Sequence, residues 1–311
     1  MAFAQGSLSR LCYGVESSSS PYGTAASGTF INLPFTSHSL NLTKDRVAGT
    51  DIQPDRMPRH DRHGNKQVSG DIVADLRHAD FDPLLESAML STFNATTGII
   101  KVGTQDKTFT MEDFNSDVDE ARLFTGLRVS SLGVSIAPNQ MVTATYSMIG
   151  RDMSISNTEK TSTTDISGNS PFDSYSGNIK LGNWAASGAT SLVASSIVTG
   201  LDFTLTNSFA PTFVVGNDLA PELEVGRAEV EGTLSVYFED ETQINRFINE
   251  TETAIEVQVG DGTETMTFLF PRSKINSADV SVDGPTSRII TMGFVSLFDT
   301  EEETNLKITR S

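Results

Sequence analysis

The chain has 311 residues, of which 37% are hydrophobic and 20% are charged, so it can bury a substantial core beneath polar loops. Its formal net charge is −18, with 22 Lys and Arg against 40 Asp and Glu, which argues against direct binding of nucleic acid because phosphates attract clustered cations. Abundant Thr, Ser, Gly and Val with few long helical patterns predict a mainly β architecture, and no apolar run is long enough to predict a membrane span.

The first 29 residues are rich in Ser and Gly and are expected to form an N-terminal arm that is flexible or orders only against a neighbour. They lack the basic region and apolar run of a secretory signal, so we expect synthesis in a cytoplasm. The single cysteine, Cys12, cannot form an intrachain disulfide and is expected to be a bystander rather than an activated thiolate. Residues 29–42 have strand character, and the polar residues 43–66 form a loop long enough to indicate an interaction role.

A first domain is predicted over residues 30–150. Residues 66–76, KQVSGDIVADL, alternate apolar and polar side chains as a half-buried strand does. Residues 81–90 follow as a short helix, with Asp80 as its expected N-cap. The strands predicted after this helix cover residues 98–102, 107–111, 124–136 and 141–149.

Residues 151–197 are dominated by Ser, Thr, Asn and Gly and are predicted to be an insertion or linker that is at best partly ordered. A second domain is predicted over residues 198–311. It contains the strand 228–238, AEVEGTLSVYF, and a helix with Thr242 as its N-cap. The helix side chains expected to face the core are Ile244, Phe247 and Ile248. The hairpins predicted after it turn at residues 260–262 and 283–286.

The two halves contain one stretch twice. At a spacing of 162 residues the strand 66–76 falls on the strand 228–238, and each copy is followed by an acidic turn and a short helix. An internal repeat of this kind predicts two tandem domains, each with the order strand, strand, helix, strand, hairpin. Matching positions are Leu40 and Phe203, Leu42 and Leu205, Val68 and Val230, Gly70 and Gly232, Val129 and Ile275, Val134 and Val280, and Ile136 and Val282.

No group of residues indicates catalysis, a cofactor or a metal. His60 and His63 form the only histidine cluster, and their segment offers at most two His and one Asp where a metal needs three or four converging ligands. No Ser lies in a Gly-x-Ser-x-Gly turn, and Gly260-Asp-Gly262 lies in a hairpin rather than before a helix, which excludes a phosphate loop. We therefore predict a protein that is not an enzyme and has no catalytic, cofactor-binding or metal-binding residues.

Six segments of the chain together form a recognisable pattern. They are GRAEVEGTLSVYFED at 226–240, the helix 242–252, FPRSKI at 270–275, RMPR at 56–59, GDIVADL at 70–76 and FDPLLESAML at 81–90. On these segments both halves resemble the major tail tube proteins of long-tailed, siphovirus-like bacteriophages, in which a G-x-L-x-V-x-F strand precedes a short helix and a β-hairpin. The resemblance covers most of residues 29–308, and residues 151–196 depart from it.

The resemblance implies two tandem tail-tube-like β-sandwich or half-barrel domains, each with a short flanking helix and a long hairpin, 124–149 and 274–297, that lines a lumen. Subunits of such proteins join their inner sheets edge to edge into rings, and stacked rings enclose the tape measure protein and later conduct DNA into the host. Tail terminator and distal tail proteins are further implied partners, and the protein belongs to the virion. An acidic chain can supply a lumen wall that repels phosphates, so DNA passes without specific binding.

The repeat also leads to a prediction of ring size. Rings of this family commonly contain six tube domains, so a chain with two domains predicts a homotrimer with pseudo-sixfold symmetry. The alternative is a homohexamer in which the first half is decoration. Two rival functions are a carbohydrate- or receptor-binding β-sandwich protein, which would expose Trp and Tyr platforms, and a hydrolase built from dispersed carboxylates.

Overall fold

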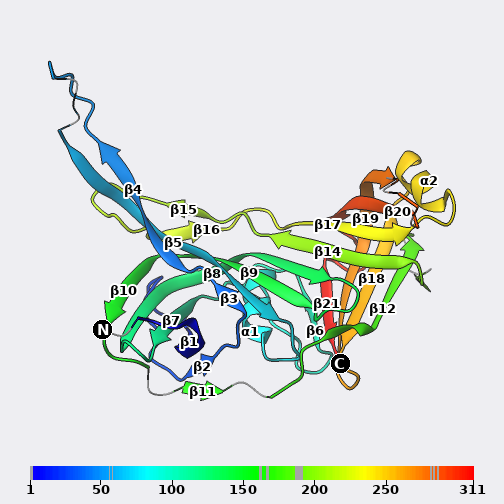
Figure 1. Cartoon of the computed structure of the whole chain (residues 1–311), viewed down its shortest axis with the longest axis horizontal. Helices are drawn as coiled ribbons and strands as arrows, with labels where there is room; N and C mark the ends of the chain where they lie inside the picture. The colour runs from blue at the N-terminus through cyan, green and yellow to red at the C-terminus, as the bar shows by residue number, and fades with distance from the viewer. Residues whose placement is uncertain are drawn as a thin grey trace.

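The computed structural model describes residues 3–55, 57, 59–160, 163–165, 168–185, 192–280, 282, 284–285 and 287–311. The described residues are mainly β, as the composition predicts, with two short α-helices and one 3-10 turn, Gly6–Leu8. Figure 1 shows the first half on the left and the second half on the right, with a long hairpin projecting at the upper left. The predicted turn 283–286 and the motif 56–59 lie partly outside the described residues.

The first half consists of two layers of strands that share the long strand β8 (Glu120–Ile136). The first part of β8 pairs with β7 (Phe109–Asn115) and β10 (Asp152–Ser156), and its last part pairs with β9 (Thr143–Gly150). The other strands here are β1 (Ser9–Val15), β2 (Phe30–Asn32), β3 (Ser37–His38), β4 (Asn41–Ala48), β5 (Asp61–Asp75), β6 (Ile99–Lys101) and β11 (Thr163–Asp165).

The second half is built in the same way around β19 (Thr265–Val280). The first part of β19 pairs with β18 (Thr253–Gly260) and β21 (Lys307–Arg310), and its last part pairs with β20 (Ile289–Leu297). The other strands here are β12 (Asp173–Asn183), β13 (Val193–Ala194), β14 (Val198–Thr206), β15 (Ala210–Thr212), β16 (Glu222–Glu224) and β17 (Glu229–Tyr237).

One continuous apolar core runs through both halves. Helix α1 (Asp82–Met89) contributes four fully buried apolar side chains to it, because its sequence places two adjacent pairs of them one helical turn apart. In the second half the rings of Phe203 and Phe270 lie 5.0 Å apart, and those of Phe270 and Phe294 lie 5.3 Å apart. Burying a side chain of this size stabilises the fold by about 1.5–3 kcal/mol.

Both helices differ from the prediction at their ends. The N-cap of α1 is Phe81 rather than Asp80, and no side chain caps it. Helix α2 (Thr242–Ile248) starts at Thr242, which was predicted to be its N-cap, and ends four residues before residue 252. Phe247 and Ile248 do not face the core as predicted but are 38% and 64% exposed, because α2 packs mainly against the single strand β19. Ile244 does pack against the core.

Two segments are more ordered than their composition indicates. The N-terminal arm contains β1, which pairs with β7 and buries Leu11, Cys12 and Tyr13, so the prediction that it is flexible or needs a neighbour is wrong. The apolar side chains of Leu11, Cys12 and Tyr13 outweigh the flanking Ser and Gly. Within the predicted linker, β10 pairs with β8 and β12 pairs with β18. Among the described residues, no helix is long and apolar enough to cross a membrane.

Candidate functional site: a continuous sheet with two open edges

A single sheet runs through both halves. Its eight strands follow the order β4, β5, β9, β8, β14, β17, β20, β19, and every neighbouring pair is antiparallel. The halves join at the centre, where β8 pairs with β14 and places Phe203 opposite Val134 and Leu205 opposite Leu132. We call this pairing the internal junction.

The strand register of the first half recurs in the second. Gly70 lies opposite Met148 in the β5–β9 pair, and Gly232 lies opposite Phe294 in the β17–β20 pair. The register of β8 against β9 shifts between Val129 and Ser131, and that of β19 against β20 shifts at the corresponding place, between Ile275 and Ser277. Corresponding strand positions in the two halves differ in residue number by a constant offset. The offset is 163 from β3 and β4 to β14, and 162 from β5 to β17. It is 146 from β8 to β19 and from β9 to β20.

The two ends of the sheet are open edges. Residues 277–280 of β19 pair with β20 on one side, and residues 41–43 of β4 pair with β5 on one side. On their other sides, no strand pairs with either segment within the described part of the chain. Their counterparts, residues 131–134 and 204–206, belong to β8 and β14, which pair with each other at the internal junction. The open edges are therefore the counterparts of the two strands that the chain joins at its own centre.

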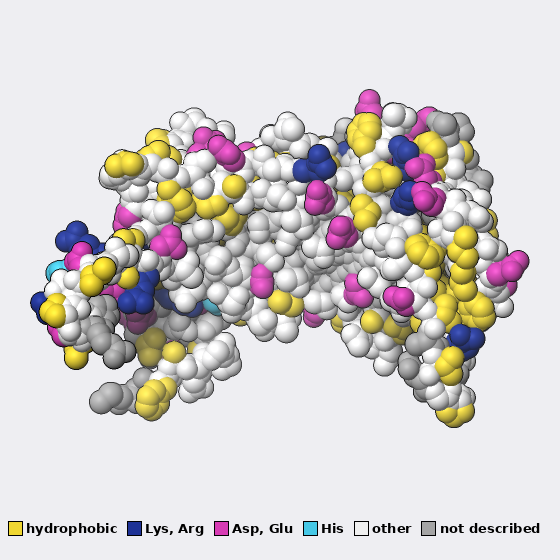
Figure 2. Space-filling view, turned by 90° about the horizontal axis from the view of Figure 1, so that it is seen from above, with side chains coloured by type: hydrophobic (Ala, Val, Ile, Leu, Met, Phe, Trp, Pro, Cys, Tyr) yellow, Lys and Arg dark blue, Asp and Glu magenta, His cyan; other side chains and the backbone are white. Residues whose placement is uncertain are grey.

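One face of the sheet carries small polar and acidic side chains. Its outward positions alternate with the core positions, as the two-residue period of a strand requires. No Lys or Arg occupies the outward positions of β9, β14, β17 and β20, or of β5 from Ser69 onward. Figure 2 shows mostly uncharged side chains over the middle of the molecule, with Asp and Glu scattered among them. The carboxylates at outward positions are Asp71, Asp75, Asp202, Glu229, Glu231 and Asp279.

Residues 207–228, between β14 and β17, lie along the first half, and Arg128 of β8 anchors them. The guanidinium donates to the carbonyl oxygen of Leu223 at 2.8 Å and lies 2.5 Å from a carboxylate oxygen of Asp106. It also stacks on the ring of Tyr22, with its carbon 4.9 Å from the ring centre. Burial raises the pKa of Asp106, and the charge of Arg128 opposes that rise. The buried Arg128 thus fixes a loop of one half on the sheet of the other.

Backbone contacts extend this arrangement to the base of β5. The backbone N–H of Lys66 donates to the carbonyl oxygen of Asp218 at 2.8 Å, and the Lys66 ammonium lies 2.6 Å from the Asp218 carboxylate. The Asn207 side chain donates to the carbonyl oxygen of Ala88 at 2.8 Å. Residues 207–228 are therefore held at both ends against the first half.

The corresponding segment of the first half, residues 44–66, contacts residues 207–228 at its base through Lys66, and most of it projects from the body (Figure 1). We call it the arm; it has 23 residues, against 22 in residues 207–228. It forms the hairpin of β4 and β5 that projects from the body in Figure 1, and most of its described residues are exposed. Its exposed apolar side chains are Val47, Ile52 and Met57. The sequence-based expectation of an interaction role for this loop stays a prediction.

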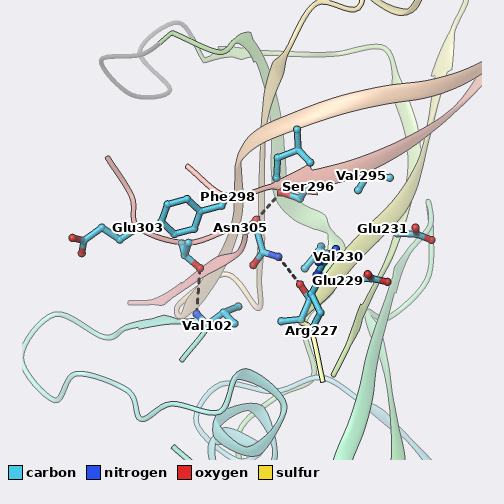
Figure 3. Close-up of a pocket in the computed structure, with 13 residues that line it drawn as sticks. Val102, Arg227, Glu229, Val230, Glu231, Val295, Ser296, Phe298, Glu303 and Asn305 are labelled. Atoms are coloured by element: carbon cyan, nitrogen blue, oxygen red, sulfur yellow. Dashed lines mark hydrogen bonds between the residues drawn. The ribbon is translucent and has the colours of Figure 1, made fainter. Parts of the chain in front are cut away.

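A pocket of about 480 Å³ opens at the end of β17 and β20, next to Phe298, and we call it the Phe298 pocket. Figure 3 shows the ring of Phe298 beside it, and Asn305 donates from its side-chain amide to the carbonyl oxygen of Ala228 at 3.1 Å. Phe298 is 59% exposed. Val230 and Val295 supply apolar wall. The acidic residues around the pocket are Glu229, Glu231 and Glu303.

The residues considered as candidates for chemistry lie either on the exposed arm or in the core. His60 and His63 are exposed on the arm, and the described residues contain no group of three or more His, Cys, Asp or Glu that could hold a metal. Cys12 is fully buried, and burial, together with the nearby Glu112 carboxylate, raises its pKa to about 12. Such a thiol is not a nucleophile at neutral pH.

Trp184, on which a sugar-binding platform would depend, is already engaged. Its indole N–H donates to the Asp299 carboxylate at 2.6 Å. The guanidinium of Arg272 stacks over its ring, with the guanidinium carbon 4.7 Å from the ring centre. Neither contact could be anticipated from the sequence, because the three residues come from separate segments of the second half.

Comparisons with known proteins point to one family. The family model for phage tail tube proteins matches residues 6–296. A solved chain from the tail of an empty GTA particle, described with C6 symmetry, matches with 15% identity and a TM-score of 0.29, and covers 40% of this chain and 93% of that chain. No curated protein sequence matches.

Proposed function

Since this chain belongs to the phage tail tube protein family and is a structural component of the virion tail, we propose that its copies close into rings that stack to form the tail tube. The observation that carries the proposal is the continuous eight-stranded sheet with an open edge at each end. An unpaired sheet edge is a liability for a protein that stays monomeric. Head-to-tail contacts that close into a ring pair every such edge.

We further propose that each chain supplies two tube domains, residues 30–150 and 198–311. The recurrence of the same strand order and register in both halves supports this division. Three chains then provide six tube domains, which makes the ring a homotrimer with pseudo-sixfold symmetry. A homohexamer is the alternative, with the second half alone closing the ring and the first half as decoration.

The acidic face of the sheet is proposed to line the lumen. Its outward carboxylates and its lack of outward Lys and Arg on five strands would repel the phosphates of DNA rather than bind them. Small uncharged side chains between the carboxylates leave few groups that could hold a strand by hydrogen bonds. Such a wall suits a tube that houses the tape measure protein and later lets DNA pass, with tail terminator and distal tail proteins at its ends.

Electron microscopy of the purified full-length protein tests this function. Rings or tubes with a central channel are expected, and their formation should require no other protein, because both edges are present in every copy. A sample that remains monomeric at high protein concentration would contradict the proposal. Binding of the monomer to sugars in a glycan array would then favour the carbohydrate-binding alternative.

A further inference from the structure

The internal junction between β8 and β14 is a template for the contact between two copies of the chain. We propose that a second copy adds its β3–β4 edge to the open edge of β19 in the register of the internal junction, and lays its arm on the Phe298 pocket. The partner is thus a second copy of this chain, bound head to tail. The inference rests on the proposed ring, but it specifies which strands meet, in which register, and what covers the pocket.

The register follows from the coinciding positions. Residues 38–43 correspond to residues 201–206 with an offset of 163, and residues 277–280 correspond to residues 131–134 with an offset of 146, which in the sequence places Val282 at the position of Ile136. At the internal junction Leu205 lies opposite Leu132. Transferring that junction to two copies pairs Leu42 with Ala278, Leu40 with Val280, His38 with Val282, and Asn41 with Asp279.

The apolar side chains at the β19 edge fit this pairing. Val282 is 67% exposed in the single chain, whereas its counterpart Ile136 at the internal junction is 6% exposed. Val280 is half-buried, and its counterpart Val134 is buried. An incoming strand that carries Leu40 and Leu42 on its core side would complete the apolar layer.

The polar side of the pairing is complementary as well. At the internal junction the hydroxyl of Ser135 donates to the Asp202 carboxylate. In the transferred register, the amide of Asn41 faces the carboxylate of Asp279, and both side chains are exposed in the single chain. An amide N–H can donate to a carboxylate, so this pair, which takes the place of Thr204 and Gly133, adds a polar contact of the kind that Ser135 and Asp202 make at the internal junction.

The described part of the second half lacks a covering segment that the first half has. Residues 207–228 cover Arg128 and meet the backbone of Lys66. No described segment lies in this way over their counterparts, Lys274 and Ala228; Lys274 pairs with Glu250, and the carbonyl oxygen of Ala228 accepts from Asn305. The side chain of Lys274 is 43% exposed, against 5% for Arg128. Ala228 lines the Phe298 pocket. The pocket therefore lies where a corresponding segment would rest.

The arm of a second copy has the length and the side chains needed to cover this pocket. It is one residue longer than residues 207–228, and it exposes apolar side chains that an apolar pocket can bury. Residues 44–63 hold five Lys or Arg against four Asp, in a chain with 22 basic and 40 acidic residues. Three Glu surround the pocket with one Arg. A segment with a slight excess of basic residues thus meets an acidic rim.

Cysteine cross-linking tests the register. Asn41→Cys protein is mixed with Asp279→Cys protein, and the mixture is oxidised or treated with a linker of about 5 Å, the spacing of side chains directly opposite in antiparallel strands. The mixture should give a covalent dimer, and each variant alone should give none. The double variant should give a ladder that ends at the number of chains in a closed ring. The buried native Cys12 should not react.

Two comparisons make the result decisive. Mixing Thr43→Cys with Asp279→Cys shifts the register by two residues and should cross-link several-fold less. Within one chain, Ser135→Cys with Asp202→Cys should close in full without a change in size. Rings that form while the shifted pair links better than Asn41 with Asp279 would overturn the register and leave the proposed function standing. Failure of the unmodified protein to assemble at all would contradict both.

A second variant tests the arm contact. Phe298→Glu should weaken assembly and lower the yield of the Asn41–Asp279 cross-link, because it puts a fourth acid beside the arm and removes the ring. Ile155→Glu, at a side chain with comparable exposure on β10, is the matched control and should leave both unchanged. Equal behaviour of the two variants would overturn the assignment of the pocket to the arm.

Discussion

At the scale of single residues, equivalent positions in the two halves hold the same residue for different physical reasons. Gly70 has a positive φ of 152°, and a Cβ there would lie 2.6 Å from the backbone of Ser39. A Cβ at Gly232 would instead lie 2.4 Å from the ring of Phe294. Both copies need glycine, the first for a close backbone and the second for a bulky cross-strand neighbour. The sequence pattern could locate this pair but not distinguish the two causes.

Arg128 and Lys274 form the most informative pair of counterparts. We expect Arg128→Leu to lower the free energy of unfolding of the unassembled protein by about 3 kcal/mol, since it strips a buried partner from Asp106 and a donor from the Leu223 carbonyl. Lys274→Leu should change it by less than about 0.5 kcal/mol, because that side chain is partly exposed. Chemical denaturation measures both values. Equal losses would contradict the anchoring role of Arg128.

At the scale of elements, local sequence patterns predict where the strands and hairpins lie, but not which strands pair with each other. The strands 66–76 and 228–238 and the hairpins 124–149 and 274–297 were found from alternation and turn residues, and the structure places β5, β17, β8–β9 and β19–β20 there. The ends of both helices were missed because tertiary contacts rather than cap residues decide them. The pairing of β8 with β14 joins residues more than 60 positions apart, and no local period reports such a partner.

The arm and residues 207–228 show how position in the chain decides conformation. The two segments occupy corresponding places in the repeat and have nearly equal lengths, 23 and 22 residues. The second has the first half beside it and folds onto Arg128, whereas the first has no neighbouring half beside it in the single chain and stands out as a hairpin. The segment that has a neighbouring half packs against it, and the segment without one projects.

Removing the tip of the arm tests its role. Replacing residues 49–60 by Asn-Gly, a two-residue hairpin turn that keeps Ala48 opposite Asp61, should leave the melting temperature within about 2 °C, because the described residues that are lost are exposed or, for Gln53, half-buried. Assembly into rings or tubes should be lost or strongly reduced. Thermal unfolding and electron microscopy of the same sample measure the two effects. Tubes of normal yield from the shortened chain would show that the arm is dispensable for the contact between copies.

At the scale of the whole molecule, the two halves behave as one unit in the fold and as two units in the proposed ring. One apolar core spans both halves, and β21 of the second half pairs with β6 of the first. The internal junction therefore fixes the relative position of two like sheets in advance. A ring built from such chains needs half as many contacts between chains as a ring built from single domains.

The number of chains in the ring tests this account most directly. Native mass measurement of isolated rings, together with symmetry analysis of tube cross-sections, should show three chains per ring and threefold symmetry with a weaker sixfold pattern. Contacts between chains should alternate with internal junctions of the same strand geometry. Six chains per ring with true sixfold symmetry would contradict the proposal that each chain supplies two tube domains.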